Sequence, residues 1–364
     1  MTTEALLHRL LEFETVTGNR EAMDACFEYI KDILQPVPVY VREYEHNGMP
    51  VLVITPNRRK HAKLWLAAHL DVVPGKPEQF VPKHKGGKLY GRGAFDMKFA
   101  AACYVSLLTE LGTSVADYDV GVVFTCDEEQ GGHSGVRYFL ETQKYTGDVA
   151  FLPDGTGCWQ FEQSAKGKML LQVVTHGEPA HGGKPWLGRS ATHELMQVLD
   201  ELRKAIDRMA KDDAEHWHAT CHVGEIRGGE APNMLAAHAE ATMDVRCATK
   251  AEFTSFRKTV TRLRNKYRHT DIHVLNPDLP YGIPKSNGYA QTFARIAKER
   301  CGVDCGWARA HGASDARFFN KAGIPTILIA PKGGGSHGDK EWVDVRDLER
   351  YHDVLSEYVR TVAK

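Results

Sequence analysis

The sequence predicts an α/β fold into which an α+β domain of the ferredoxin-like type is inserted. Apolar runs without polar alternation occur before residue 155 and again after residue 325, as in strands that are buried on both faces of a sheet. Residues 168–275 have the order strand, helix, strand, strand, helix, strand, which is a split βαβ unit. A length of 364 residues suffices for two domains. We therefore expect one domain made of residues 1–166 and 283–364, and a second made of residues 167–282.

The first segment predicts two helices and then a set of strands. Apolar residues recur at helical spacing over about 6–13 and again from after Asn19 to about Leu34. Residues 39–55 predict two strands around the turn His46-Asn-Gly-Met. Residues 64–68 form an unbroken apolar run, which predicts a central strand that ends at His69.

The rest of the first domain predicts a surface loop, a buried helix and three more strands. Residues 74–93 carry Pro, Gly and Lys with little periodicity, as in a loop. Residues 97–111 are apolar nearly all round, which predicts a buried helix. Further apolar strands are expected at residues 119–127, 149–154 and 326–330, and a helix at residues 289–298.

The inserted segment predicts three strand regions and two charged helices. The strands are expected at residues 168–175, as a pair within 221–247, and at 271–275, while the helices are expected at residues 191–211 and 251–267. A proline-rich stretch at residues 276–284 marks the return to the first domain.

Composition excludes several classes of partner. Hydrophobic residues make up 42% of the chain and charged residues 26%, which is ordinary for a globular protein. The net charge of -1 gives no bulk attraction to nucleic acid or acidic membranes. The N-terminus lacks the pattern of a signal peptide, and no apolar run of about 18 residues suggests a membrane span. We therefore expect a small, individually recognised substrate. Eight cysteines without a C-x-x-C pair favour a cytoplasmic location.

Potential metal ligands follow the predicted strands. His69 and Asp71 end the central strand, Glu128 and Glu129 follow the next one, and Asp154 follows a third. Because ligands collect beyond the carboxyl ends of strands in open α/β sheets, these side chains are expected at one edge. A carboxylate at position 71 can accept the second ring N–H of a metal-bound imidazole. A capping or turn role for Asp71 is the plain alternative.

Two further candidates come from glycine-containing loops. Asp96 stands directly before the predicted buried helix, where it is either a ligand or an N-cap. His337 lies on the loop Gly333-Gly-Gly-Ser-His-Gly after the fourth core strand.

Together the five candidates His69, Asp96, Glu129, Asp154 and His337 supply two imidazoles and three carboxylates. This nitrogen and oxygen set suits zinc, or manganese or cobalt, better than calcium. Five ligands with Asp96 bridging suit two ions about 3.5 Å apart. Glu128 is then left to deprotonate a water between the ions and to pass the proton to a leaving amine. The chemistry predicted is metal-assisted hydrolysis of an amide.

The motifs HLDVVPG, GRGAFDMK, DEEQGG, PDG and SHGDKEW, in this order, resemble the di-zinc family of aminoacylase, acetylornithine deacetylase, succinyl-diaminopimelate desuccinylase and carnosinase-like dipeptidases. The resemblance covers nearly the whole chain and implies a zinc-peptidase-like catalytic domain with an inserted lid and dimerisation domain. It also implies that His69 and Asp154 bind one zinc, that Glu129 and His337 bind the other, and that Asp96 bridges. Asp71 then supports His69, and Glu128 is the general base.

The same resemblance implies substrate contacts outside the metal ligands. His181 is similar to the family's lid histidine, which often reaches the partner subunit's active site to stabilise the oxyanion. Asn233 and Arg246 resemble lid residues that grip substrate polar groups, although a surface or structural salt bridge is the alternative for them. Gly312 and Ser314 belong to a stretch that resembles the substrate-side loop. A homodimer through the inserted domain is expected.

Three functional hypotheses remain at this point. Asp at position 154 resembles family members that act on free amino termini, which favours a dipeptidase or aminopeptidase with a small peptide substrate. An N-acyl amino acid deacylase is the alternative within the same enzyme class. A metal-free binding protein is the third, and it predicts the loss of at least one ligand, but all five are present.

Overall fold

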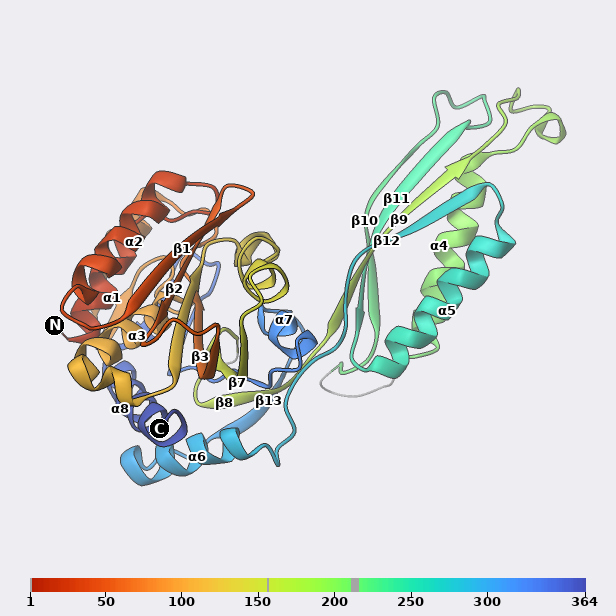
Figure 1. Ribbon diagram of the computed structural model, residues 1–364. Coiled ribbons are helices and arrows are strands. Elements are labelled where there is room, and N and C mark those ends of the chain that lie inside the picture. Colours follow the sequence, from red (N-terminus) through yellow and green to blue (C-terminus); the bar gives the residue numbers. More distant parts are fainter. Residues whose placement is uncertain (1, 156, 211–215) are drawn as a thin grey trace. The chain divides into compact units, whose positions relative to one another are not determined.

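The computed structural model describes residues 2–155, 157–210 and 216–364. The chain divides into two compact units, shown in Figure 1. Unit 1 comprises Met1–Gln163, Gly282–Ala310 and Ser314–Lys364, and unit 2 comprises Ser164–Tyr281 and His311–Ala313. The predicted α/β fold with an inserted domain is confirmed.

Unit 1 is built around a mixed sheet. Within the described residues its six strands lie in the order β1-β2-β6-β3-β7-β14. The strands β6, β3, β7 and β14 run parallel, whereas β1 and β2 are antiparallel to their neighbours. The bounds are β1 Tyr40–His46, β2 Met49–Thr55, β3 His61–His69, β6 Val120–Thr125, β7 Thr146–Phe151 and β14 Thr326–Ile327.

Helices cover this sheet. They are α1 Thr3–Leu11, α2 Arg20–Leu34, α3 Lys98–Leu111, α6 Gly288–Cys301, α7 Ala316–Lys321 and α8 Val345–Val362. Polar side chains begin four of them, because the oxygens of Thr2, Asn19, Asn287 and Asp344 each accept a backbone N–H of the first turn. These N-cap residues stabilise the starts of the four helices.

Helix α3 is a core helix. Lys98–Asp117 have the length and composition of a membrane span, with a mean hydropathy of 1.3, and 67% of that window is buried inside the protein. This window has no unbroken apolar run of about 18 residues, and it extends beyond α3 through Gly112–Asp117. The Lys98 ammonium is itself buried and donates to the carbonyls of Leu10 and Phe13, so it satisfies the end of α1.

The predicted surface loop at residues 74–93 contains regular structure. It forms the hairpin β4 Lys83–Lys85 and β5 Lys88–Tyr90, which joins β16 Trp342–Asp344 and β15 Gly333–Gly334 in a second small sheet. Each strand is too short to give an alternating pattern, which is why the sequence did not indicate them. Strands β8 Gln160–Ala165 and β13 Gly306–Ala310 form a two-stranded sheet.

The last predicted core strand is shorter than expected. Regular pairing covers Thr326–Ile327, and the following residues 328–330 instead use their backbone carbonyls to accept Glu162 N and Trp159 N. The apolar character of residues 326–330 reflects burial rather than strand length.

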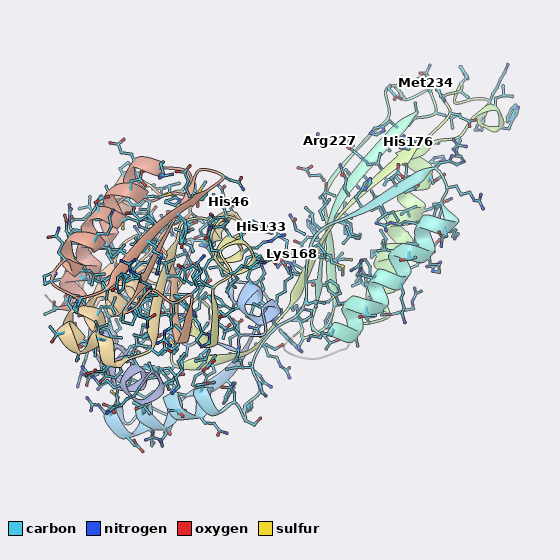
Figure 2. All side chains as sticks on the ribbon, viewed as in Figure 1. His46, His133, Lys168, His176, Arg227 and Met234 are labelled. Atoms are coloured by element: carbon cyan, nitrogen blue, oxygen red, sulfur yellow. The ribbon has the colours of Figure 1, made fainter. Side chains whose placement is uncertain are left out.

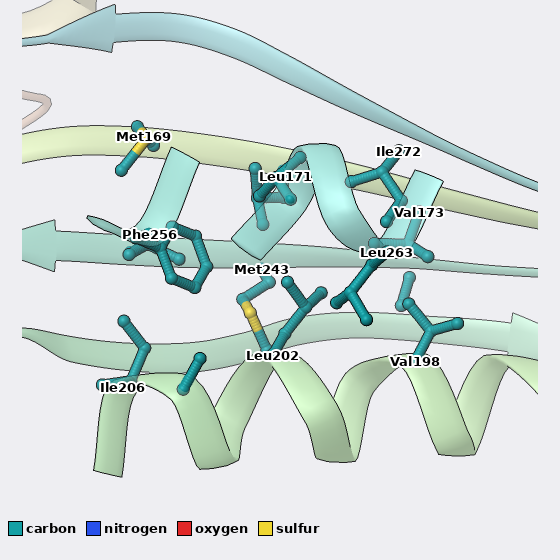
Figure 3. Close-up of a cluster of buried hydrophobic side chains, with 14 of the residues drawn as sticks. Met169, Leu171, Val173, Val198, Leu202, Ile206, Met243, Phe256, Leu263 and Ile272 are labelled. Carbon is teal, nitrogen blue, oxygen red and sulfur yellow. The ribbon is translucent and has the colours of Figure 1, made fainter. Parts of the chain in front are cut away.

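Unit 2 has the ferredoxin-like order of elements. Its strands are β9 Gly167–His176, β10 Thr220–Gly228, β11 His238–Cys247 and β12 Thr270–Asp278, in the sheet order β10-β11-β9-β12. Helices α4 Ala191–Asp207 and α5 Lys250–Lys266 lie on one face, where Leu202 and Leu263 join strand residues such as Leu171 in an apolar core (Figure 3). The alternating burial along β9 shows that its other face is only half-buried.

The long helix expected over residues 191–211 ends at Asp207, with the hydrogen bond from Arg208 N to Lys204 O closing its last turn. Lys211, the predicted end, lies outside the described residues.

Close packing on Trp65 provides a test of the core. The buried indole of Trp65 fits against Gly121 and Gly147, and a Cβ at Gly121 would lie 2.3 Å from the ring. Gly121→Ala should lower the free energy of unfolding by about 1–3 kcal/mol, since overpacking forces strain into the central strands. Urea unfolding measures this. Gly288→Ala is the matched control, because a Cβ at this position meets nothing within 4 Å. This variant should leave the urea midpoint unchanged or raise it.

Candidate metal centre

The parallel strands of unit 1 place the candidate ligands at one edge of the sheet. His69 is the last residue of β3 and pairs with Thr125, the last residue of β6. Glu128 and Glu129 lie three and four residues after the end of β6, and Asp154 lies three residues after the end of β7. Parallel neighbours end at the same edge, so the order of the strands brings these side chains together as the sequence predicted.

The carboxylate of Asp96 lies between the two histidines. Its Oδ1 is 3.2 Å from His69 Nε2, and its Oδ2 is 3.3 Å from His337 Nε2. The same His337 nitrogen is 3.2 Å from Glu129 Oε2. Two ligand groups result, one of His69, Asp96 and Asp154 and one of Asp96, Glu129 and His337, and within each group the ligand atoms lie within 4.8 Å of one another.

These residues fit a pair of divalent ions. Donor atoms at about 2.0–2.2 Å from a tetrahedral zinc lie about 3.3 Å apart, which matches the separations around Asp96. His69 Nε2 is buried and has no hydrogen-bond partner within the described residues. An unpaired buried nitrogen that faces carboxylates is what a metal ligand leaves when no ion is present.

Asp96 is not an N-cap. Helix α3 begins after Met97, and no side chain caps it. The alternative weighed for this residue is therefore excluded, and the Asp96 carboxylate faces the two histidines instead.

Asp71 supports the site in a different way from the one predicted. His69 Nδ1 is 3.0 Å from the backbone carbonyl of Asp71, whereas the Asp71 carboxylate is 3.5 Å away. The carboxylate instead accepts the backbone N–H groups of Glu128 and Glu129 and the hydroxyl of Thr17. The main chain of Asp71 orients the imidazole, and its side chain orients the turn that carries both glutamates.

The histidines carry positive charge that balances the carboxylates. Although burial opposes it, the neighbouring carboxylates of Asp71 and Asp96 raise the pKa of His69 well above its usual range. The hydrogen bond with Asp96 raises the pKa of His337 to about 9. Against the effect of burial, the two histidines lower the pKa of Asp96. A divalent ion would replace these protons as the counter-charge, so metal binding should release protons.

The remaining carboxyl groups are shifted in the opposite direction. Burial, followed by the charge of Asp154, raises the pKa of Glu128 well above its usual range. Burial and the charge of Asp96 raise the pKa of Asp154 to about 7. Burial also raises the pKa of Glu129. Crowded carboxylates with too few cations produce this pattern, and divalent ions relieve it.

Comparison with known proteins identifies the class of enzyme. Residues 65–361 match peptidase family M20/M25/M40. The chain belongs to this family. It is a metal-dependent hydrolase of amide bonds, as the motifs predicted.

Individual relatives agree with this family over nearly the whole chain. A succinyl-diaminopimelate desuccinylase from a Nitratiruptor species is 24% identical in an alignment of 371 positions, which covers 98% of this chain and 98% of the other. The crystal structure of a tripeptidase from Staphylococcus aureus is similar with a TM-score of 0.77 and 19% identity, over 99% of this chain and 97% of the other. An M20 family metallo-carboxypeptidase from Sulfolobus solfataricus gives 0.75 and 17%, over 99% of both chains.

Unit 2 of this M20 family member holds the predicted lid residues at two separate places. His181 is exposed and pairs with Met234, and Gly182 N donates to the carbonyl of Asn233, so His181 and Asn233 are neighbours. Figure 2 labels Met234 toward the same end of unit 2 as His176 and Arg227. His181 Nδ1 accepts the N–H of Gly183.

Arg246 lies at the opposite end of β11. It pairs in register with Lys168, near the point where the chain enters unit 2. It is eight residues from His238, or about 26 Å along an extended strand. Its guanidinium makes a bidentate ion pair with Asp244, at 2.7 and 3.0 Å, which is the salt bridge weighed as the alternative for this residue. The other predicted substrate residues divide between the units, Gly312 with unit 2 and Ser314 with unit 1.

The loop that contains Ser314 holds the glutamate turn in unit 1. The guanidinium of Arg317 donates to the carbonyls of Ser314 and Gly131, both at 2.7 Å. Asp315 is buried, and its carboxylate packs so closely on Gly132 that a Cβ there would lie 1.8 Å from Oδ1. Gly132 has a φ of +60°, a second reason for glycine at this position.

Sequence reasoning missed Thr17 and gave no role to Glu341. Thr17 lies 54 residues from Asp71, and nothing local indicates their contact. Glu341 is part of the motif SHGDKEW. Its side chain is 2% exposed in the structure, and no sequence pattern predicts the burial of this carboxylate.

The pKa of Asp154 predicts how the metal-free protein responds to pH. Because its carboxyl titrates near pH 7 when folded and near 3.8 when unfolded, the folded state binds more protons between these values. The free energy of unfolding should therefore fall as the pH rises from 4 to 7. Asp154→Asn should flatten this slope and stabilise the EDTA-treated protein at pH 8 by at least about 1 kcal/mol. Urea unfolding from pH 5 to 8 measures both effects.

Asp148→Asn is the matched control, because this Asp lies on the same strand β7 and its side chain is 48% exposed. Equal slopes for wild type and Asp154→Asn would show that Asp154 is not crowded by other carboxylates.

Proposed function

We propose that this chain is a di-zinc exopeptidase that cleaves small peptides, with dipeptides as the preferred class. The observation that carries the proposal is the Asp96 carboxylate, whose two oxygens face two different histidines in two adjoining ligand groups. That arrangement supports a bridging carboxylate and therefore two ions rather than one. Manganese or cobalt would suit the same donors.

The proposed mechanism assigns proton transfer to Glu128. Bound divalent ions would lower the pKa of water and polarise the scissile carbonyl. Glu128 takes a proton from the attacking water and gives it to the departing amine, so the group acts first as base and then as acid. Asp71 holds the backbone of Glu128 in place for both steps.

The choice of peptide substrates rests on Asp154. This short carboxylate leaves room beside the metal for a substrate amine. An Asp at this ligand position also resembles the family members that act on free amino termini. A solved relative is named a tripeptidase, and others are named carboxypeptidase and desuccinylase. The alternative function is therefore an N-acyl amino acid deacylase.

We further propose a homodimer in which unit 2 acts as a lid. His181 and Asn233 lie at the end of unit 2 opposite to Arg246, and the length of β11 keeps these two ends too far apart to contact one small peptide together. Arg246, near the entry of the chain, serves the site of its own subunit in this proposal, and His181 stabilises the oxyanion in the partner's site.

A cytoplasmic location is proposed from the thiols. Within the described residues, which include all eight cysteines, each cysteine is free. Burial raises the pKa of Cys26 to about 11, so this thiol packs as a small apolar group. Proteins of oxidising compartments more often pair their cysteines.

Glu128→Gln tests the base and the substrate class together. The variant should bind two ions like the wild type but hydrolyse its substrate about 10²–10⁴-fold more slowly, because the proton carrier is gone. Initial rates on dipeptides, N-acetylated dipeptides and N-succinylated amino acids, each with zinc, manganese and cobalt, measure it. Dipeptides should be the best substrates of the wild-type enzyme. A higher rate on acylated amino acids would establish the deacylase instead, and a normal rate for Glu128→Gln would remove Glu128 from the mechanism.

Mixing two inactive variants tests the dimer. Glu128→Gln and His181→Ala should each lose activity, and subunit exchange between them should restore about a quarter of the wild-type rate, since each mixed dimer has one complete site. Sedimentation measures the oligomeric state in parallel. Mixing that restores no activity, or a chain that sediments as a monomer, would contradict the shared site.

A further inference from the structure

Glu341 is a buried carboxylate near the metal centre whose two oxygens are both fully engaged. The residue is 2% exposed. Oε1 accepts the backbone N–H groups of Phe95 and Asp96, and Oε2 accepts the N–H of Gly93 and the guanidinium of Arg92, with all four distances at 2.9 Å. The backbone carbonyl of Glu341 also accepts the N–H of Gly91. One residue thus fixes the whole loop that ends at Asp96.

Arg92 extends these contacts to two other loops. Its buried guanidinium pairs with Glu341, and its Nη2 lies 3.4 Å from the carbonyl of His337 and 3.5 Å from that of Pro74. Pro74 belongs to the segment that follows His69 and Asp71 along the chain. Arg92 and Glu341 therefore connect three segments that each present a ligand.

His337 depends on this anchor more than the other ligands do. Its side chain is 57% exposed, its φ is +63°, and glycines occupy positions 333–335 and 338 around it. A glycine-rich segment loses much backbone entropy when it is ordered. By contrast, His69 ends a buried strand, and Asp154 closely follows one.

We propose that Glu341, with Arg92, is a positioning residue that sets the affinity for the ion held by Asp96, Glu129 and His337. This inference rests on the proposed two-ion function. The clamp, meaning Glu341 together with Arg92, holds the main chain of Asp96 directly and that of His337 through Arg92, so it governs two of the three ligands in that group. In the group of His69, Asp96 and Asp154 it governs one. The two ions should therefore respond unequally to the loss of the clamp.

The test is a metal titration of Glu341→Gln. A carboxamide offers a single acceptor oxygen and turns an N–H₂ group toward either the two amides or the Gly93 and Arg92 donors. Titration of the metal-free protein with Co²⁺, followed by visible absorption and by equilibrium dialysis, measures two dissociation constants. The ion held by Asp96, Glu129 and His337 should lose about 10- to 100-fold in affinity, as expected when a residue that orients ligands is lost. The affinity for the ion held by His69, Asp96 and Asp154 should change by less than about threefold, and the absorption bands of the ion bound by His337 should shift.

Asp339→Asn is the matched control. Asp339 lies on the same loop as His337 and Glu341, but its side chain is 68% exposed and pairs with Lys76. This variant should bind both ions like the wild type. If Glu341→Gln does not fold, the same titration is made with Arg92→Lys, which should show the same unequal loss of affinity. Lysine keeps the positive charge beside Glu341 but has no second nitrogen to donate to the carbonyl of His337.

The outcomes separate this inference from the function beneath it. A wild-type protein that binds fewer than two ions would contradict the two-ion site itself, and the inference with it. A wild type with two ions, and a variant with both affinities unchanged or both weakened equally, would overturn the role of Glu341 alone.

Discussion

The structure depends on the crowding of carboxylates at one edge of the central sheet. Asp71, Asp96, Glu128, Glu129 and Asp154 converge there, and His69 and His337 face them with positive charge. In a buried setting, like charges at these distances are tolerated only when cations or hydrogen-bond donors balance them. The opposite pKa shifts of the histidines and of Glu128 and Asp154 record this imbalance. Divalent cations satisfy it, which is why the same residues both strain the metal-free protein and define its function.

Much of this arrangement could be predicted because it follows from strand order. Strands such as β3 and β6 are continuous apolar runs, and each is followed at once by polar residues. Parallel strands carry those residues to a single edge, so their meeting needs no knowledge of loops. The ferredoxin-like unit was equally accessible, since alternation along β9 and the helical periodicity of α4 are local signals.

What the sequence could not provide were contacts whose partners are distant and whose geometry has no period. The carboxylate of Asp71 was expected to face His69, yet it accepts the amides of Glu128 and Glu129, because two backbone donors outcompete a ring nitrogen that the Asp71 carbonyl already accepts. Arg246 is paired with Asp244, two positions away on the same face of β11, which an alternating strand allows but does not require. The hairpin within residues 74–93 has strands of three residues, too short for any pattern.

The ligands differ in how the fold holds them: some are positioned by the central sheet, and others by hydrogen bonds between loops. His69 ends a buried strand and is oriented by the adjacent carbonyl of Asp71, so its position comes with the folding of the sheet. Asp96 and His337 lie on loops, and their placement relies on hydrogen bonds made to Glu341 and Arg92 from segments about 245 residues apart. A site assembled in this way has one part that is preorganised by the core and another that is completed by buried polar contacts. The bridging carboxylate belongs to both ligand groups, whereas the glycine-rich loop supplies His337 to one group alone, so the loss of the clamp acts chiefly on that group.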